Sequence, residues 1–290
     1  MTQEMKQEAA HLLKGAPVAK AMTEKNAQTA EELKARGITP TLAIIRLGEK
    51  PGDLSYEKGA LKRADKTGVK VKQFVFPEDM TEDALLEEIR KINDDSSIHG
   101  VLMFRPLPSH INEKRVCEAL APEKDMDGIT SGSMAGVFMD TEIGYPPCTA
   151  EAVMEIFDHY GIELKGKKVT IFGRSLVIGK PVAMMIMKRH ATITVCHSRT
   201  TPEDFRAAGR GADIVVTALG RARMIGSDTL GSGQTIIDVG INVDEEGNLC
   251  GDVDFEAAEP DAAAITPVPG GVGSVTTAVL MKHVLQAAGK

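Results

Sequence analysis

Hydrophobic positions along the first half of the chain alternate between helical and strand periods. β-Branched, apolar runs bounded by glycine indicate buried strands, and apolar residues spaced three and four apart indicate amphipathic helices. Strands are predicted at 41–47, 69–76 and 100–104, and helices at about 17–36, at about 55–67 and after the capping residue Thr81. This βαβαβ order predicts a parallel sheet with right-handed crossovers.

The pattern restarts after a proline-rich boundary near Tyr145–Thr149. The second half is predicted to hold strands at 168–172, 191–196, 214–217 and 235–239, and helices at about 150–160, 179–189 and 274–288. We therefore expect two α/β units with a cleft between them, divided near residues 147 and 148.

Composition narrows the class of protein. The 290 residues are 42% hydrophobic and 26% charged, as in ordinary soluble proteins, and the net charge of −7 argues against nucleic-acid or anionic-membrane binding. The four cysteines are far apart, which excludes a disulfide scaffold and the usual zinc spacings. Met1–Lys6 lacks the features of a signal peptide, and no apolar run approaches the length of a membrane span. We expect a cytoplasmic protein without a metal site.

A glycine-bounded turn, Gly173–Gly179, lies between a predicted strand and a predicted helix. This context is typical of a dinucleotide site, although the pattern is not G-x-G-x-x-G and would also suit a purely structural turn. A P-loop is excluded, because five residues separate the glycines and Pro181 stands where a magnesium-binding hydroxyl belongs. The next strand ends without a carboxylate. Ser198 and Arg199, together with Arg174, favour the 2′-phosphate of NADP over NAD, the alternative being a solvated loop.

Several separated motifs then coincide with one family. They are Tyr56, Gly100-Val-Leu-Met-Phe-Arg-Pro-Leu-Pro108, Lys124-Asp-Met-Asp-Gly128, Pro147-Cys-Thr149, Gly173-Arg-Ser175 with Gly179-Lys-Pro181, Cys196-His-Ser198, Asp238-Val-Gly-Ile-Asn242, Gly251-Asp-Val253 and Thr266-Pro-Val-Pro-Gly-Gly-Val-Gly273. In this order they cover nearly the whole chain. The sequence resembles the bifunctional methylenetetrahydrofolate dehydrogenase/methenyltetrahydrofolate cyclohydrolase enzymes, the FolD family.

The resemblance implies two α/β domains with a catalytic cleft between them. The first would comprise residues 1–147 joined by the C-terminal helix at about 271–290, and the second, residues 148–270, would be a Rossmann-like parallel sheet. It also implies a homodimer that binds NADP and tetrahydrofolate derivatives, with folate in the interdomain cleft. It implies catalytic and substrate-binding roles for Tyr56, which would pack along the folate ring system, and for Asp127, whose carboxylate would hold the pterin. The implied substrate-binding set further contains Met103, Phe104, Arg105, Pro269, Gly270, Gly271, Val272 and Gly273. The implied cofactor-binding set is Thr149, Gly173, Arg174, Ser175, Ser198, Arg199 and Ile241.

Three positions depart from the family pattern around one expected pocket. The family lysine one helical turn after the tyrosine is Ala60 here, the partnering glutamine is Phe104, and a usual serine is Asp53. Lys58 and Lys62 should face elsewhere on the helix. Asp53 is either a replacement base or a loop carboxylate. Hydride transfer depends mainly on positioning, whereas cyclohydrolysis needs proton transfers.

We therefore predict NADP-dependent oxidation of 5,10-methylenetetrahydrofolate with absent or weak cyclohydrolase activity. The alternatives are a fully bifunctional enzyme and a catalytically silent folate or nucleotide binder. A hydroxy-acid oxidoreductase would leave Pro269-Gly-Gly-Val272 unexplained.

Overall fold

The computed structural model describes residues 10–290, so the prediction made on Met1–Lys6 lies outside the described residues. The chain divides into two units, each made of two separate segments. We call residues 19–148 with 276–290 the three-stranded unit, and residues up to Val18 with 149–275 the six-stranded unit. Within the described residues, no helix is long and apolar enough to cross a membrane.

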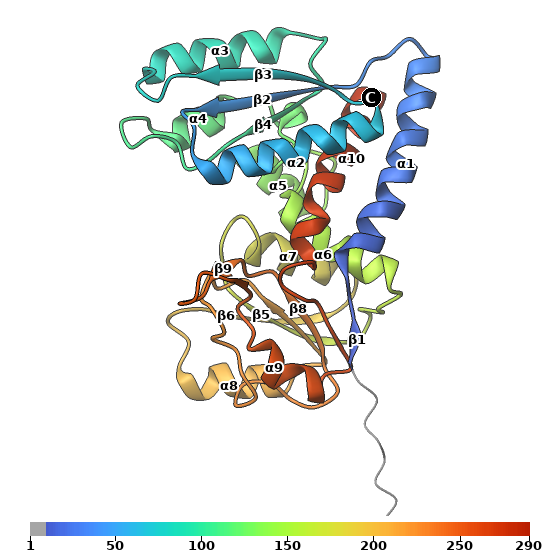
Figure 1. The fold of residues 1–290 in the computed structure, drawn as a ribbon, viewed down its shortest axis with the longest axis vertical. Helices are drawn as coiled ribbons and strands as arrows, with labels where there is room; N and C mark the ends of the chain where they lie inside the picture. The colour runs from blue at the N-terminus through green and yellow to red at the C-terminus, as the bar shows by residue number, and fades with distance from the viewer. Residues whose placement is uncertain (1–9) are drawn as a thin grey trace, which may run out of the picture. The chain divides into compact units, whose positions relative to one another are not determined.

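The three-stranded unit contains a parallel sheet in the order β3-β2-β4. Its central strand is fully buried, as its apolar sequence predicts, and α10 packs against α2, β2 and β4 (Figure 1). Side chains of α3 and α4 build a separate core with alternate residues of β2 and β4. The elements are β2 (Thr41–Leu47), α2 (Pro51–Thr67), β3 (Lys70–Phe76), α3 (Glu82–Asp94), β4 (Gly100–Met103), α4 (Glu113–Ala119), α5 (Ser131–Met139) and α10 (Thr276–Gly289).

The six-stranded unit contains a parallel sheet in the order β1-β11-β8-β7-β5-β6. From β5 the chain crosses to β6 on one side and then returns to β7 on the other, so the direction of winding reverses at β5. The sheet strands and their helices are β1 (His11–Leu12), β5 (Lys168–Phe172), α7 (Gly179–Lys188), β6 (Thr192–Cys196), α8 (Pro202–Arg210), β7 (Ile214–Thr217), β8 (Thr235–Asp238) and β11 (Ala264–Ile265). A β9–β10 hairpin (Asn242–Val243, Leu249–Cys250) and the short α9 (Phe255–Ala258) complete the unit.

The α/β class and the parallel sheets predicted from the sequence are confirmed. The structure also contains elements that were not predicted, and three differences bear on the site and the units. Helix α2 begins at Pro51 rather than Ser55, so Asp53 lies in its first turn and is not a loop carboxylate. The short β1 was not predicted, and it joins the six-stranded sheet by pairing with β11. The division between the units falls after Val18 in α1 (Gly15–Ala35) and after Cys148 in α6 (Cys148–His159), so residues 10–18 group with the six-stranded unit and not with the segment that follows them.

Candidate functional site

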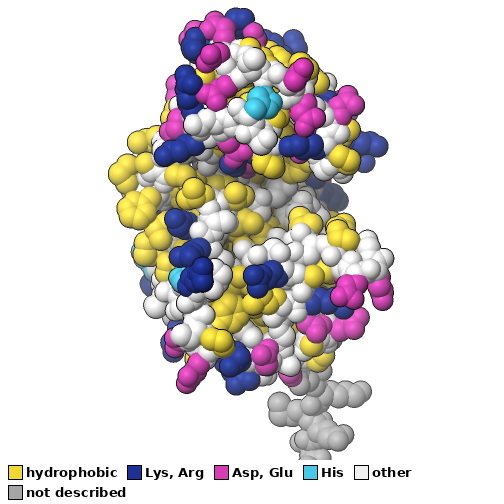
Figure 2. Space-filling model, turned by 90° about the vertical axis from the view of Figure 1, so that its left-hand side faces the viewer, with side chains coloured by type: hydrophobic (Ala, Val, Ile, Leu, Met, Phe, Trp, Pro, Cys, Tyr) yellow, Lys and Arg dark blue, Asp and Glu magenta, His cyan; other side chains and the backbone are white. Residues whose placement is uncertain are grey.

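A pocket of about 540 Å³ opens at the carboxyl ends of the central strands of the six-stranded sheet. Gly173, His197 and Ala218 line it, and each directly follows a strand: β5, β6 and β7 respectively. The pocket therefore lies where the winding of the sheet reverses, which is where open α/β sheets bind their ligands. On the face shown in Figure 2, Lys and Arg side chains and hydrophobic side chains gather over this unit.

Gly173 is required by the geometry of the turn after β5. Its φ of +124° favours glycine, and a Cβ atom there would lie 2.3 Å from the Ala218 carbonyl oxygen. A Cβ on Gly179, at the start of α7, would lie 2.3 Å from the Gly173 carbonyl oxygen. Both glycines thus permit close approach of the turn, the neighbouring loop and the helix N-terminus, which explains their spacing in the sequence.

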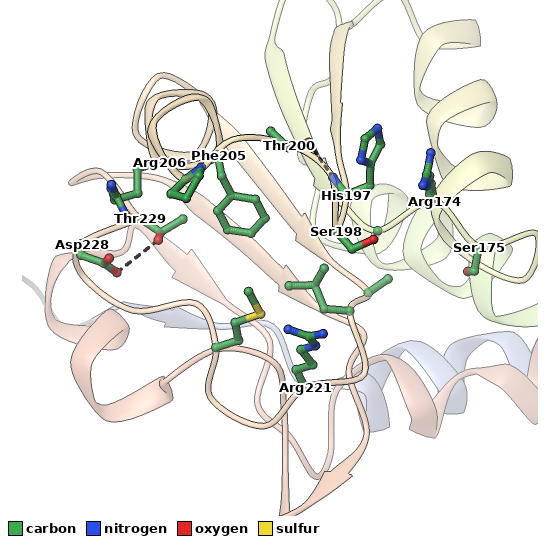
Figure 3. Close-up of a pocket in the computed structure, with 15 residues that line it drawn as sticks. Arg174, Ser175, His197, Ser198, Thr200, Phe205, Arg206, Arg221, Asp228 and Thr229 are labelled. Carbon is green, nitrogen blue, oxygen red and sulfur yellow. Dashed lines mark hydrogen bonds between the residues drawn. The ribbon is translucent and has the colours of Figure 1, made fainter.

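The pocket carries positive charge and hydroxyl groups at one end. Arg174, Ser175 and Ser198, which are among the residues expected to bind the cofactor, line it, and Arg221 enters from the loop after β7, on the other side from Ser198 (Figure 3). Among the described residues, neither Arg174 nor Arg221 forms an ion pair with a carboxylate. The predicted Arg199 is exposed and is not part of the lining.

His197 lines the pocket and also shapes its rim. Its Nδ1 atom accepts a hydrogen bond from the Arg199 backbone N–H at 3.1 Å, and the backbone N–H of His197 donates to the Thr200 hydroxyl at 3.0 Å. These bonds fold the loop that presents Ser198. His197 therefore has a structural role in this loop.

Sequence reasoning missed the residues that come from α8 and from the loop after β7. Phe205 stacks on Phe172 with ring centroids 4.3 Å apart and forms a wall of the pocket. The buried Asp252 carboxylate accepts hydrogen bonds from the backbone N–H groups of Leu219 (2.5 Å) and Arg221 (2.9 Å), and so holds the loop that carries Arg221. The signal for Asp252 was the Gly251-Asp-Val253 motif. The further missed lining residues are Thr200, Pro202, Arg206, Leu219, Met224, Asp228 and Thr229.

A second group of predicted residues comes together within the three-stranded unit. The rings of Tyr56 on α2 and Phe104 after β4 meet edge to face, with centroids 5.9 Å apart. Burial is the main cause that raises the pKa of Tyr56 well above its ordinary value, and the thiol of Cys148 and the carboxylate of Asp127 act in the same direction. A hydrogen bond with Thr276 opposes them. Tyr56 is therefore a neutral phenol at physiological pH, beside an apolar ring.

Asp127 is anchored to the residue that begins α6. Its Oδ1 atom accepts a hydrogen bond from the Cys148 backbone N–H at 2.9 Å. Burial raises the pKa of this carboxyl, whereas the hydrogen bond from the Cys148 backbone N–H lowers it. The preceding residues of the Lys124-Asp-Met-Asp-Gly128 motif have structural roles. The Lys124 ammonium donates to three carbonyls at the end of α3, those of Ile92, Asn93 and Asp95, at 2.7–2.9 Å.

Asp125 likewise has a structural role, in the entry to α5. Its buried carboxylate accepts from the Ile129 and Thr130 N–H groups and from the Ser133 hydroxyl at 2.7–3.0 Å. Of the two carboxylates in the motif, only that of Asp127 remains a candidate for ligand binding.

The position that holds a lysine in the family pattern is a fully buried alanine in this chain. Ala60 has no exposed surface, whereas Lys58 and Lys62 are exposed, as their helical spacing predicted. Arg105 forms an ion pair with Glu113 at 3.6 Å, and Met103 is buried in β4. No lysine therefore stands one helical turn after Tyr56.

The remaining predicted residues belong to the six-stranded unit. Thr149 is half-buried in the first turn of α6, and Ile241 is 66% exposed. The segment 269–273 follows β11, with Pro269 and Gly270 exposed and Gly271 and Val272 buried. A Cβ atom on Gly273 would lie 3.4 Å from the Ile241 side chain, so these two predicted positions are neighbours.

Comparison with known proteins identifies the family. Residues 13–127 match the catalytic domain of tetrahydrofolate dehydrogenase/cyclohydrolase, and residues 147–290 match its NAD(P)-binding domain. The chain belongs to the tetrahydrofolate dehydrogenase/cyclohydrolase family. It is 48% identical over 277 residues to the bifunctional protein FolD of Alkaliphilus oremlandii, with 96% of each chain covered.

Solved structures of this family have the same fold. The bifunctional FolD enzyme of Campylobacter jejuni superposes with a TM-score of 0.93 at 36% identity, over 97% of this chain and 99% of that one. The Trypanosoma brucei dehydrogenase-cyclohydrolase, solved with NADP and an inhibitor, gives a TM-score of 0.90 at 33% identity, over 97% and 98%. The resemblance inferred from separated motifs is thereby confirmed.

Proposed function

We propose that this protein is an NADP-dependent 5,10-methylenetetrahydrofolate dehydrogenase. The observation that carries the proposal is the cationic pocket at the reversal point of the six-stranded sheet, in a chain that matches both domains of this family. In the reaction, the methylene carbon loses a hydride and becomes the methenyl cation. NADP, when bound, supplies the hydride acceptor.

The residues that line the pocket fit the adenosine and phosphate groups of this cofactor. Because Gly173 and Gly179 have no side chains, a pyrophosphate can approach the N-terminus of α7. Arg174, Ser198 and Arg221 supply the charge and hydroxyl donors that a 2′-phosphate requires. We propose Ser175, Thr149 and Ile241 as further cofactor contacts. Arg199 lies outside the pocket lining. It would therefore contribute to cofactor binding only through its exposed charge.

On the folate side, Asp127 would accept hydrogen bonds from the amino and ring N–H groups of the pterin. Its anchoring by Cys148 holds one carboxylate oxygen, which leaves the other to accept from the ligand. Tyr56 and Phe104 would provide an apolar surface for the ring system, since their edge-to-face contact fixes both rings. Met103, Arg105 and the 269–273 segment would complete the substrate contacts.

We further propose that the methenyl product leaves without enzyme-catalysed hydrolysis. Hydrolysis adds water to the methenyl carbon and requires a group that takes up a proton. The fully buried Ala60 and the ring of Phe104 replace the lysine and glutamine of the family pattern. Arg105 is a poor base because a guanidinium group does not readily give up its proton, and this one pairs with Glu113. Asp53 lies in the first turn of α2, where a carboxylate stabilises the helix N-terminus. This structural role accounts for Asp53 without a role as a base.

The first experiment supplies the purified protein with methylenetetrahydrofolate and NADP. NADPH, methenyl- and formyltetrahydrofolate are then measured, and spontaneous hydrolysis is subtracted. Methenyl product that accumulates in a one-to-one ratio with NADPH supports the proposal. Prompt enzyme-dependent formyl product would show the fully bifunctional alternative, and binding without NADPH formation would show a silent binder.

A paired substitution tests the role of the two replaced positions. Ala60→Lys with Phe104→Gln should raise hydrolysis above the spontaneous rate, up to the roughly 10²-fold that a positioned proton-transfer group contributes. Lys58→Ala with Lys62→Ala is the matched control, because both side chains are exposed on the same helix. A folded, folate-binding double variant without any gain would refute this explanation.

We propose a homodimer as the assembly. The six-stranded sheet ends in β6, whose Val195 is 37% exposed, and an uncovered edge strand with apolar residues favours pairing with another chain. Light scattering after size exclusion should give twice the chain mass, and Val195→Lys should shift it toward the monomer.

A further inference from the structure

We propose that His283, on the C-terminal helix α10, is a positioning residue for Asp127, the side chain that we propose to bind the pterin. The inference rests on the proposed function, since it assumes that Asp127 binds the pterin. All the groups involved belong to the three-stranded unit. His283 has no exposed surface, so it acts on the ligand only through the residues that it contacts.

The hydrogen bond of His283 ends on the peptide unit immediately before Asp127. Its Nδ1 atom lies 2.8 Å from the carbonyl oxygen of Met126. A carbonyl oxygen only accepts hydrogen bonds, so Nδ1 must carry the proton and donate. The same oxygen accepts from the thiol of Cys148 at 3.2 Å. Two donors from different elements therefore fix the orientation of this peptide.

The backbone on either side of that carbonyl is also held. The Met126 N–H donates to the Val101 carbonyl of β4 at 3.3 Å, and the Asp127 carboxylate accepts from the Cys148 N–H at 2.9 Å. The Met126 side chain has no exposed surface, and a Cβ on Gly100 would lie 2.5 Å from its Cγ. Rotation of the 126–127 peptide, which would turn the Asp127 side chain, is opposed by these contacts together with the bond from His283.

The imidazole ring is itself held in one plane. Tyr145, which is 5% exposed, stacks on it with centroids 5.0 Å apart and an interplanar angle of 34°. Because the ring cannot swing, the Nδ1–H group is preorganised toward the Met126 carbonyl. Preorganised supporting groups of this kind are what keep a binding residue within a fraction of an ångström of its working position.

Substitution of His283 separates positioning from simple core packing. His283→Leu fills similar space but removes the donor. His283→Asn keeps a donor, because its amide nitrogen is also a δ atom, one bond beyond Cγ. Gln286→Leu is the control on the same helix, since Gln286 is exposed. The steady-state constants for methylenetetrahydrofolate, the Kd for NADP and the thermal midpoint are measured for each variant.

We expect the Leu variant to raise the KM for methylenetetrahydrofolate about tenfold, as for a lost hydrogen bond that leaves a buried carbonyl with one donor fewer. Its kcat should change less than KM, and its Kd for NADP should not change. The Asn variant should restore most of the affinity, and Gln286→Leu should match the unmodified protein. A Leu variant with KM within twofold of the original, or an Asn variant as weak as the Leu variant, would overturn the proposal.

A folding defect is distinguished by a further variant. His283→Ala introduces no larger group, and if both Leu and Ala variants fail to fold while Asn folds, the role is structural and the proposal is wrong. An unmodified protein that forms no NADPH from methylenetetrahydrofolate would contradict the proposed function instead. The two failures are therefore separate results.

Discussion

The ion pair between Arg46 and Glu57 supports a quantitative prediction, because both side chains are almost fully buried. Arg46 Nε lies 2.8 Å from Glu57 Oε2, and the two side chains are 8% and 5% exposed. The other carboxylate oxygen accepts from Gln73, and Arg46 also donates to the Gly48 carbonyl. The pair thus ties α2 to β2 directly beside Tyr56.

Removal of one partner leaves the other charge uncompensated in a dry environment. Glu57→Leu should therefore lower the free energy of unfolding by about 3–5 kcal/mol, the usual cost of breaking a buried pair. Arg46→Met together with Glu57→Leu removes both charges and should restore most of that loss. Because the free energy of unfolding of native proteins is about 5–15 kcal/mol, the Glu57→Leu variant should be only marginally stable at 37 °C.

Urea denaturation followed by circular dichroism measures the effect, with the double-mutant cycle giving the coupling between the two side chains. NADP binding serves as the control, since the cofactor pocket belongs to the six-stranded unit. Lys20→Ala, which breaks an exposed i,i+4 pair with Glu24, should cost almost nothing. A Glu57→Leu variant that loses less than about 1 kcal/mol would refute the argument from burial.

Three further predictions concern the sites themselves. Gly173→Ala should raise the KM for NADP at least about tenfold without changing folate affinity, because its Cβ would meet the Ala218 carbonyl at 2.3 Å; steady-state kinetics with each substrate varied would check this. Burial raises the pKa of Asp127 above 3.8, so the KM for folate should rise as pH falls through that raised pKa, and Asp127→Asn should flatten the profile. Lys124→Met removes three hydrogen bonds to the end of α3 and should cost roughly 3 kcal/mol at about 1 kcal/mol each, measured by urea denaturation; an unchanged midpoint would contradict it.

Local sequence signals predicted the elements that carry their own pattern. The apolar run 41–47 and the glycine-bounded turn at Gly173 specify their conformation within a few residues, so both lie where expected. The strand β1 has two residues and no pattern of its own, and it forms only because β11, about 250 residues later, offers an edge. A strand of this kind is invisible to periodicity.

The site residues that were missed share the same origin in long-range structure. Arg221 and Phe205 enter the pocket because the sheet order places β7 and β6 on either side of β5, which no spacing in the sequence reveals. His283 resembles any other position of an apolar helix until its bond to Met126 is seen. Gly173 was predicted because backbone geometry demands its residue type, whereas Asp127 was predicted from the resemblance of its motif to that of the family.

The alternation of the chain between its units has a consequence for synthesis on the ribosome. Both units take segments from distant parts of the chain, and the three-stranded unit receives its final segment, residues 276–290, only after the whole six-stranded unit has been synthesised. During synthesis, the emerging sheet of β2, β3 and β4 therefore lacks the helix that covers part of it. Domains that fold as they emerge are normally continuous segments, whereas this one must wait for its last fifteen residues. A stop codon at Thr276 would thus leave the other segment of the three-stranded unit in place but expose the apolar surface against which α10 packs, and such a fragment should aggregate or be degraded rather than persist as a shortened enzyme.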